Sequence, residues 1–131
     1  MKIAAQVIRF SVVGGVGFVV DGGLLYCLTS AGFDPVLARS FSFPLALIST
    51  FTLNRIWTFK SEIRTNIIKQ FFKYLASQLV GATANFICFA VVLSFMVDTP
   101  TNSLIAFALA SGIGMFFNFA GSKFFVFRQT T

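Results

Sequence analysis

The few side chains that could take part in chemistry lie within or beside long apolar stretches of the sequence. Asp21 is the clearest case. A carboxylate at the centre of a membrane-spanning helix costs about 2.5–3.5 kcal/mol on insertion scales, so such residues face other helices or a wet cavity. We expect Asp21 either to be protonated or to pair with Arg39, which would have to reach inward by about two helical turns. Asp21 then either takes a functional role or acts as a purely structural polar clamp.

Two basic residues, Arg55 and Lys123, extend rows of polar residues at the ends of the second and fourth apolar stretches. A pair of cations on facing helices could hold a lipid phosphate, because an Arg guanidinium offers a planar fork suited to phosphate oxygens. The alternative is that these cations only anchor the helix ends by snorkelling to the membrane surface. We favour anchoring for Lys60 and Arg128.

The sequence offers no support for other kinds of chemistry. The chain contains no His, and its Cys, Asp and Glu residues are not clustered at the spacing of a metal site. Cys27 and Cys88 fall inside apolar stretches and are expected to be small apolar fillers. Gly14-Gly15-x-Gly17 also lies inside such a stretch rather than after a strand, which argues against a nucleotide-binding loop. We therefore expect no enzyme, no bound metal and no cofactor.

The elements that must position these residues are four long apolar stretches. Each is close to the ~20 residues that a helix needs to cross the ~30 Å hydrocarbon core. Hydrophobic residues make up 56% of the chain and charged residues only 11%, against about a quarter in soluble domains. We expect an all-α membrane protein with one domain, residues 1–131, and four transmembrane helices. The expected spans are residues 8–31, 36–57, 74–97 and 103–125.

The basic residues predict which way the spans run. Arg39 stands apart from the other basic residues, which lie before the first span, around the connection between the second and third spans, or at the end of the chain. The positive-inside rule places this side, and so both termini, in the cytoplasm. Residues 58–73 form the connection on that side, and apolar residues recur in it at helical spacing. We expect this connection to be an amphipathic segment on the inner leaflet.

The second half of the chain resembles the first. A shift of 64 residues pairs Arg9 with Lys73 and Asp21 with Asn85, and a shift of 68 pairs Asn54-Arg55 with Ser122-Lys123. Since each half has two spans, the repeats are expected to be parallel.

The repeat collects small and polar residues in rows four apart, which lie on one face of a helix. Such rows form either a polar path for a substrate or simply packing seams with hydrogen bonds across them. Both readings stay open for Ser42, Thr50, Ser77 and Ser122. The rows are Arg9-Val13-Gly17-Asp21, Ser42-Ala46-Thr50-Asn54, Lys73-Ser77-Gly81-Asn85 and Ala110-Gly114-Asn118-Ser122.

Three segments, in this order and spacing, carry a family resemblance. They are Arg9-Phe10-x-x-x-Gly14-Gly15-x-Gly17-x-x-x-Asp21, then Leu53-Asn54-Arg55-x-Trp57-Thr58-Phe59, then Asn118-Phe119 followed by Lys123-Phe124-Phe125-Val126-Phe127. Together they resemble the GtrA-like family of small four-span membrane proteins, which is associated with cell-surface polysaccharide synthesis. The resemblance covers nearly the whole chain, and its most specific part is the Asn54–Phe59 segment.

The resemblance implies a translocase that carries a polyprenyl-phosphate-linked sugar from the cytoplasmic to the outer face of a membrane. The distribution of the family implies that this is a bacterial inner membrane. It implies a glycosyltransferase that loads the carrier lipid as a partner, and membrane lipids as surroundings. The family's polar positions fall here on Asp21, Asn54, Arg55, Asn118 and Lys123, to which the rows and the ion pair add Arg39 and Asn85. A departure from the family is Ser122, where many relatives have a bulkier residue.

Two other functions fit four spans. A small proton-coupled exporter of cationic drugs would use one membrane-embedded acid, but it has little use for the cations Arg55 and Lys123. A non-transporting membrane subunit would only anchor a glycosyltransferase. Four spans also enclose little volume, which favours a homo-oligomer as a way to complete a transport path.

Overall fold

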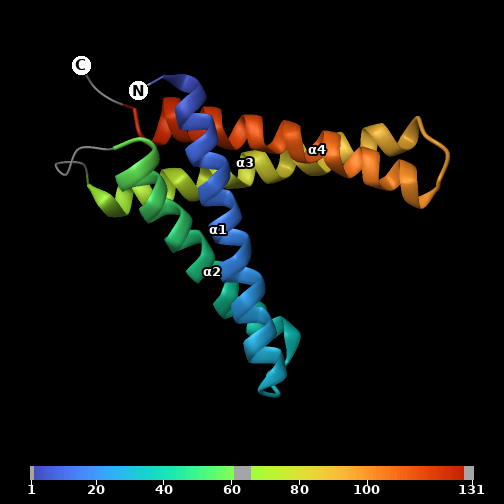
Figure 1. The fold of residues 1–131 in the computed structure, drawn as a ribbon, viewed down its shortest axis with the longest axis horizontal. Helices are drawn as coiled ribbons and strands as arrows, with labels where there is room; N and C mark the ends of the chain where they lie inside the picture. Colours follow the sequence, from blue (N-terminus) through green and yellow to red (C-terminus); the bar gives the residue numbers. More distant parts are fainter. Residues whose placement is uncertain (1, 61–65, 129–131) are drawn as a thin grey trace. The chain divides into compact units, whose positions relative to one another are not determined.

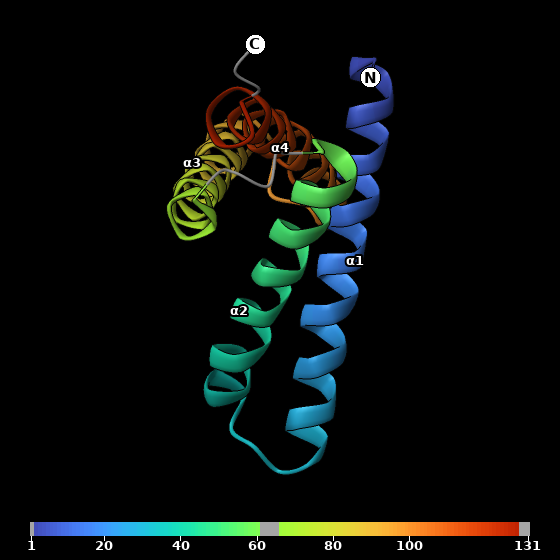
Figure 2. The same ribbon diagram turned by 90° about the vertical axis from the view of Figure 1, so that its left-hand side faces the viewer.

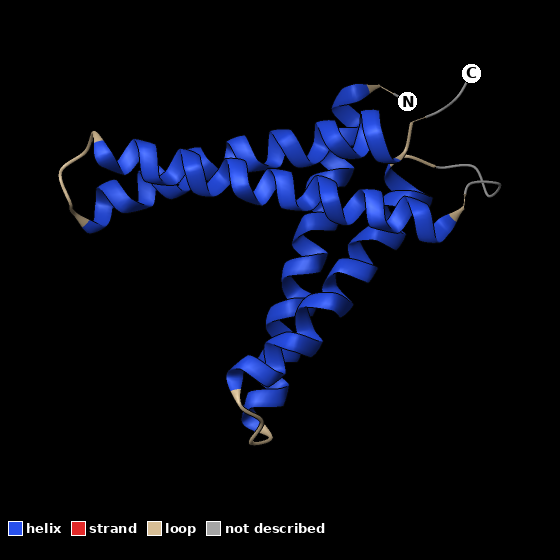
Figure 3. Ribbon diagram, turned by 180° about the vertical axis from the view of Figure 1, so that it is seen from behind, coloured by secondary structure: helices blue, strands red, loops and turns tan. Residues whose placement is uncertain are grey.

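A computed structural model describes residues 2–60 and 66–128, and every regular element in these ranges is a helix (Figures 1 and 3). The chain divides into two compact units, residues 1–63 and 64–131. Each unit is an antiparallel pair of helices, and we call them hairpin 1 and hairpin 2.

Hairpin 1 consists of α1 (Ile3–Ser30), α2 (Pro35–Leu53) and a five-residue π-helix, η1 (Asn54–Thr58), that continues α2 (Figure 2). The Asp34 carboxylate starts α2, since it accepts hydrogen bonds from the backbone N–H groups of Val36 and Leu37 at 3.0 and 3.2 Å. Pro35 follows at the first helical position, where its missing N–H costs nothing. The turn between the helices is therefore fixed by local sequence.

Hairpin 2 consists of α3 (Ile67–Ser94), α4 (Pro100–Gly121) and a second π-helix, η2 (Ser122–Val126). The Asn66 side chain caps α3, and the Thr99 hydroxyl accepts a hydrogen bond from the N–H of Asn102 at 3.1 Å at the start of α4. Pro100 stands at the first position of α4, as Pro35 does in α2. α2 and α4 thus begin in the same way, with a capping side chain followed by Pro at the first helical position.

All four helices are long and apolar enough to cross a membrane, with mean hydropathies between 1.4 and 1.9. This confirms the prediction of an all-α membrane protein with four spans. All four helices begin before the predicted spans. The largest differences are at α1, which begins at Ile3 instead of residue 8, and at α3, which begins at Ile67 instead of residue 74. Of the predicted amphipathic connection 58–73, residues 61–65 lie outside the described residues, and the part from Ile67 onward is continuous with α3.

The two hairpins repeat one design, as the shifts of 64 and 68 residues predicted. α1 and α3 each contain 28 residues, and each second helix ends in a five-residue π-helix. The closing hydrogen bonds also match: the N–H of Phe59 bonds to the carbonyl of Asn54 at 2.9 Å, and that of Phe127 to Ser122 at 2.8 Å. From residue 54 and from residue 122, the same order of buried and exposed positions follows.

The rows of small and polar residues lie between the helices of each hairpin. In hairpin 1, Val13 and Gly17 are buried on α1 opposite a buried row on α2 that includes Ser42 and Asn54. A Cβ atom on Gly17 would collide with the methyl group of Thr50, so the helices touch at this level. Glycine permits this close approach of the two backbones. The rows therefore lie at the contacts between the helices of each hairpin.

Candidate functional site

A cluster of three polar side chains joins α1 and α2, which we call the ion-pair cluster: Asp21, Arg39 and Ser42. One carboxylate oxygen of Asp21 lies 2.7 Å from a guanidinium nitrogen of Arg39, and the other accepts a hydrogen bond from the Ser42 hydroxyl at 2.8 Å. The structure thus confirms the pairing with Arg39 that was one of the two expectations for Asp21. Ser42 is fully buried, and its role as the third member was not foreseen.

The exposure of the two charged partners differs. The side chain of Asp21 is 18% exposed, whereas that of Arg39 is 54% exposed. The guanidinium also stands over the ring of Phe43, with 5.7 Å between its central carbon and the ring centroid. Asp21 is therefore enclosed by the hairpin, while Arg39 presents the rest of its guanidinium outward.

The second pair of predicted residues, Asn54 and Arg55, begins the π-helix η1. Asn54 is 1% exposed, and its side-chain carbonyl accepts a hydrogen bond from the Thr58 hydroxyl at 2.9 Å. Arg55, the next residue, is half-buried. Arg39 and Arg55 are sixteen residues apart along α2 and η1, or about 24 Å at 1.5 Å per residue. The structure thus places the polar residues of hairpin 1 in two separate regions.

Hairpin 2 carries the matching end, with Ser122 and Lys123 in place of Asn54 and Arg55. Ser122 is fully buried, and Lys123 is half-buried with its ammonium 5.8 Å from the centroid of the Phe124 ring. Both hairpins therefore hold a buried small polar residue followed by a half-buried cation at the first two positions of a π-helix.

Contacts from the preceding helix hold each of these ends in place. Arg9 donates a hydrogen bond to the carbonyl of Trp57 at 3.0 Å and lies 5.2 Å from the centroid of the Trp57 ring. In hairpin 2, the ammonium of Lys73 lies 5.3 Å from the Phe125 ring. Contacts of this kind, between a cation and an aromatic face, are attractive. Arg9 and Lys73 thus position the two π-helical ends. The sequence had identified them only as a matched pair of basic residues.

Buried aromatic rings complete the two ends in the same way. The ring centroids of Phe10 and Phe59 are 6.2 Å apart, and those of Tyr74 and Phe127 are 6.0 Å apart. Gln70 adds a buried hydrogen bond to the carbonyl of Val126 at 3.3 Å. Each π-helix is therefore followed by a ring that packs against the first helix of its hairpin, four residues after the cation.

The remaining predicted residues, Asn85 and Asn118, lie on facing helices of hairpin 2. Asn118 packs against Gly81 of α3, and Asn85 packs against Gly114 of α4, so the two amides are about one helical turn apart. Within the described residues, the Asn118 side-chain carbonyl and the hydroxyls of Ser77 and Ser122 are buried without a hydrogen-bond partner. These atoms lie toward the π-helical end of hairpin 2, since Ser77 packs against Gly121 and Ser122 begins η2.

Metal ligands are not gathered anywhere in the described part of the chain, since no group of three His, Cys, Asp or Glu side chains lies close enough to hold an ion. Cys27 and Cys88 are free thiols on different hairpins. The chemistry that the described side chains can offer is charge pairing and hydrogen bonding.

Four apolar helices with polar seams and cationic ends define a small integral membrane protein. The chain belongs to the GtrA/DPMS transmembrane domain family, whose sequence model matches residues 9–130. This confirms the predicted resemblance.

Two relatives differ in how much of their length the chain spans. A dolichol-phosphate mannosyltransferase from Pyrococcus furiosus is 29% identical over 108 residues, which cover 82% of this chain but only 31% of that protein. The uncharacterized membrane protein YngA of Bacillus subtilis is 26% identical over 123 residues, covering 93% of this chain and 79% of YngA. The chain therefore corresponds to about a third of the mannosyltransferase and to most of YngA.

Proposed function

We propose that this protein is a translocase that moves a polyprenyl-phosphate-linked sugar from the cytoplasmic to the outer face of a bacterial inner membrane. The observation that carries the proposal is the cationic π-helical end, built once in each hairpin around Arg55 and Lys123. The family membership and the likeness to a dolichol-phosphate mannosyltransferase support a lipid-linked sugar as the substrate class.

The physical problem that such a protein solves is desolvation. A sugar phosphate cannot enter hydrocarbon readily, because its hydroxyl groups and its charge lose water without replacement. In the proposed mechanism, Arg55 and Lys123 bind the phosphate at the cytoplasmic surface through charge-assisted hydrogen bonds. The polyprenyl chain stays in the lipid throughout, so only the head group needs protein contacts, and no covalent step is required.

Polar groups farther along the helices would replace water around the sugar. Asp21, Asn85 and Asn118 are each partly exposed, so their outer atoms are available for such contacts. Asn54 is buried and bonded to Thr58, so its contribution is to hold the end on which Arg55 is mounted. The proposed partners are a polyprenyl-phosphate glycosyltransferase that loads the lipid, and further copies of this chain that complete the path.

Flipping by the purified full-length protein in liposomes tests the proposal. We expect liposomes with the protein to expose a short-chain polyprenyl-phosphate sugar, loaded on the inner leaflet, to an impermeant oxidant. Arg55→Ala and Lys123→Ala should each reduce this exposure to the level of protein-free liposomes, because each removes the cation from one of the two π-helical ends. Arg128→Ala removes an exposed cation near the same end and should flip normally.

Normal flipping by both Arg55→Ala and Lys123→Ala would remove the phosphate-binding role from these residues. Protein yield and helix content, measured by circular dichroism, must match the unsubstituted chain in all variants for the comparison to hold. Flipping by the purified chain without a glycosyltransferase would also exclude a second candidate function, in which the chain only anchors a glycosyltransferase.

That second candidate is a membrane subunit that anchors a glycosyltransferase without moving lipid. It is favoured by one observation, namely that the chain matches only 31% of the Pyrococcus mannosyltransferase. If liposomes with the purified chain expose no substrate, while the chain still binds its glycosyltransferase, the anchoring function replaces the translocase.

A further inference from the structure

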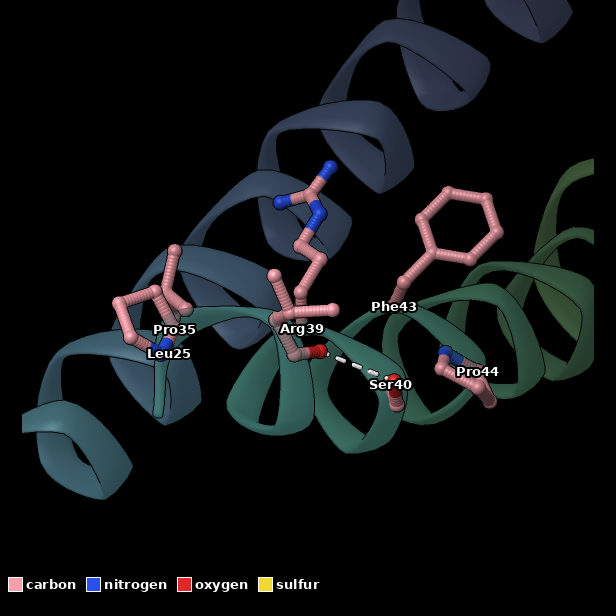
Figure 4. A pocket seen from close by; sticks show the side chains of 7 residues that line it. Leu25, Pro35, Arg39, Ser40, Phe43 and Pro44 are labelled. Carbon is pink, nitrogen blue, oxygen red and sulfur yellow. Dashed lines mark hydrogen bonds between the residues drawn. The ribbon is translucent and has the colours of Figure 1, made fainter. Parts of the chain in front are cut away.

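A groove on hairpin 1 lies next to the ion-pair cluster, on the side of α2 near the α1–α2 connection (Figure 4). Its volume is about 540 Å³, and its walls are almost entirely apolar. Figure 4 shows the Arg39 side chain extending from α2 toward α1, beside the Phe43 ring. The residues that line it are Leu25, Pro35, Val36, Arg39, Ser40, Phe43 and Pro44.

The groove combines a hydrocarbon surface with one cation. The Ser40 hydroxyl is already used, because it donates a hydrogen bond to the carbonyl of Val36 at 2.9 Å. Arg39 has five N–H donors, and its contact with Asp21 occupies one end of the guanidinium. A ligand with an anionic head and an apolar tail matches this combination.

The expected depth of the guanidinium in the membrane argues for one kind of lipid. Arg39 is paired with Asp21. Asp21 lies nine residues before Ser30, the last residue of α1, and this spacing corresponds to about 13 Å along the helix. α1 is about 42 Å long, so if it is centred on a ~30 Å core, Asp21 lies about 7 Å below the hydrocarbon boundary. Phosphates of resident phospholipids lie at the surface above that level. A phosphate that meets Arg39 there belongs to a lipid whose head group is crossing.

We propose that Arg39 and the adjoining groove form a second phosphate-binding site, which holds the polyprenyl-phosphate-linked sugar in transit near the α1–α2 connection. The site rests on the proposed function for its ligand, and it lies about 24 Å along hairpin 1 from Arg55. The Arg39 guanidinium binds the phosphate, and the groove takes the first isoprene units of the tail.

Asp21 has a distinct part in this site. Its carboxylate competes with the phosphate for the same guanidinium, so it weakens phosphate binding and favours release. Removing the carboxylate should therefore strengthen phosphate binding, whereas removing the Arg39 guanidinium should weaken it. A purely structural clamp predicts that both changes weaken whatever binds beside it, so the sign of the Asp21 effect separates the two roles.

Photolabelling of the full-length protein in phosphatidylcholine liposomes tests the site, with a farnesyl phosphate that carries a diazirine on its tail. We expect the label on residues 35–44, found by mass spectrometry of peptides. Arg39→Ala should reduce it about tenfold, the effect of one lost hydrogen bond to a charged group. Asp21→Asn should raise it, and Arg128→Ala, which removes a cation at the end of the chain, should leave it unchanged.

Because Arg39→Ala leaves Asp21 without its partner, a second variant guards against misfolding. Asp21→Asn combined with Arg39→Gln removes both charges together and keeps hydrogen-bonding side chains at both positions. This double variant should also lose the label. Retained labelling in the double variant, or equal labelling by the matching farnesol without phosphate, would overturn the site.

Competition identifies the lipid. Unlabelled farnesyl phosphate should displace the label, whereas equal displacement by phosphatidylglycerol would show a site for ordinary lipid head groups and overturn the proposal. Labelling does not depend on flipping, so the two proposals fail separately. Arg39-dependent labelling without flipping would leave the site and remove the translocase, while flipping without such labelling would do the reverse.

Discussion

Ser42 connects α2 to the carboxylate of Asp21 on α1, and it is the fully buried member of the ion-pair cluster. Hydrogen bonds between helices in membranes contribute about 0.6 kcal/mol on average and about 1.7 kcal/mol at most. Ser42→Ala should therefore lower the free energy of unfolding by an amount in this range, because it removes one of the two groups that neutralise or hydrogen-bond Asp21. Unfolding of the purified protein by increasing fractions of SDS in mixed micelles measures the change.

Thr52→Ala is the matched control for this measurement. Thr52 lies on the same helix, but its hydroxyl bonds to the carbonyl of Ile48 on its own helix at 2.8 Å and faces outward. It should leave the unfolding free energy unchanged within error. Equal losses for Ser42→Ala and Thr52→Ala would mean that the bond to Asp21 adds nothing to the stability of hairpin 1.

The charged residues were predictable in kind but not in detail. A carboxylate inside a span needs a partner, which narrowed the choice for Asp21 to its own protonation or to Arg39. Ser42 could not be chosen as the third member, because the level at which α2 passes Asp21 depends on the length and geometry of the turn at residues 31–34. The contacts of Arg9 and Lys73 could not be predicted either, because they depend on where the fold brings Trp57 and Phe125 against α1 and α3.

Gly17 sets the distance between α1 and α2. A Cβ atom there would collide with the Cγ2 methyl of Thr50, whereas one on Gly14 would meet nothing within 4 Å. Gly17→Ala should therefore destabilise hairpin 1 by about 1–3 kcal/mol, the usual cost of overpacking. Gly14→Ala should be neutral or mildly stabilising, because Ala favours the helix and no neighbour opposes it. The same SDS titration compares the two variants.

The expected collision involves a single side-chain atom, the Cγ2 methyl of Thr50, so a second substitution that removes this methyl should relieve it. Thr50→Ser removes the Cγ2 methyl and keeps the hydroxyl that bonds to the carbonyl of Leu47 at 3.0 Å. Combined with Gly17→Ala, it should recover most of the lost stability. A double variant as unstable as Gly17→Ala alone would show that α1 and α2 do not meet at this contact.

The helices, their repetition and the cations at their ends could be predicted from the sequence, but the π-helical form of these ends could not. Hydropathy marks the apolar part of each helix, so it missed the amphipathic first turns of α3, although Asn66 is a recognisable N-cap. Nothing in Asn-Arg-Ile-Trp-Thr distinguishes a π-helix from an α-helix. The wider turn at that point goes with the packing of Phe59 on Phe10, a contact between distant parts of the chain.

The basic residues predict the orientation of the whole chain in the membrane. Lys60 and Arg128 lie at the cationic ends, whereas Phe33 and Asp98 lie in the connections at the opposite ends of the hairpins. Because basic residues are retained in the cytoplasm, we expect an impermeant maleimide to label Phe33→Cys and Asp98→Cys on intact cells. Lys60→Cys and Arg128→Cys should react only after the membrane is opened.

The measurement needs a background without thiols, so Cys27 and Cys88 are first replaced by Ala. Neither thiol has a disulfide partner, and both lie inside spans, so these replacements should leave the fold intact. The repeat makes the test stricter, because Lys60 and Arg128 occupy equivalent positions of the two hairpins, and the predicted parallel arrangement requires both to react from the same side. Labelling of Lys60→Cys and Asp98→Cys from the same side would contradict the parallel arrangement, and labelling of Lys60→Cys alone on intact cells would invert the proposed direction of transport.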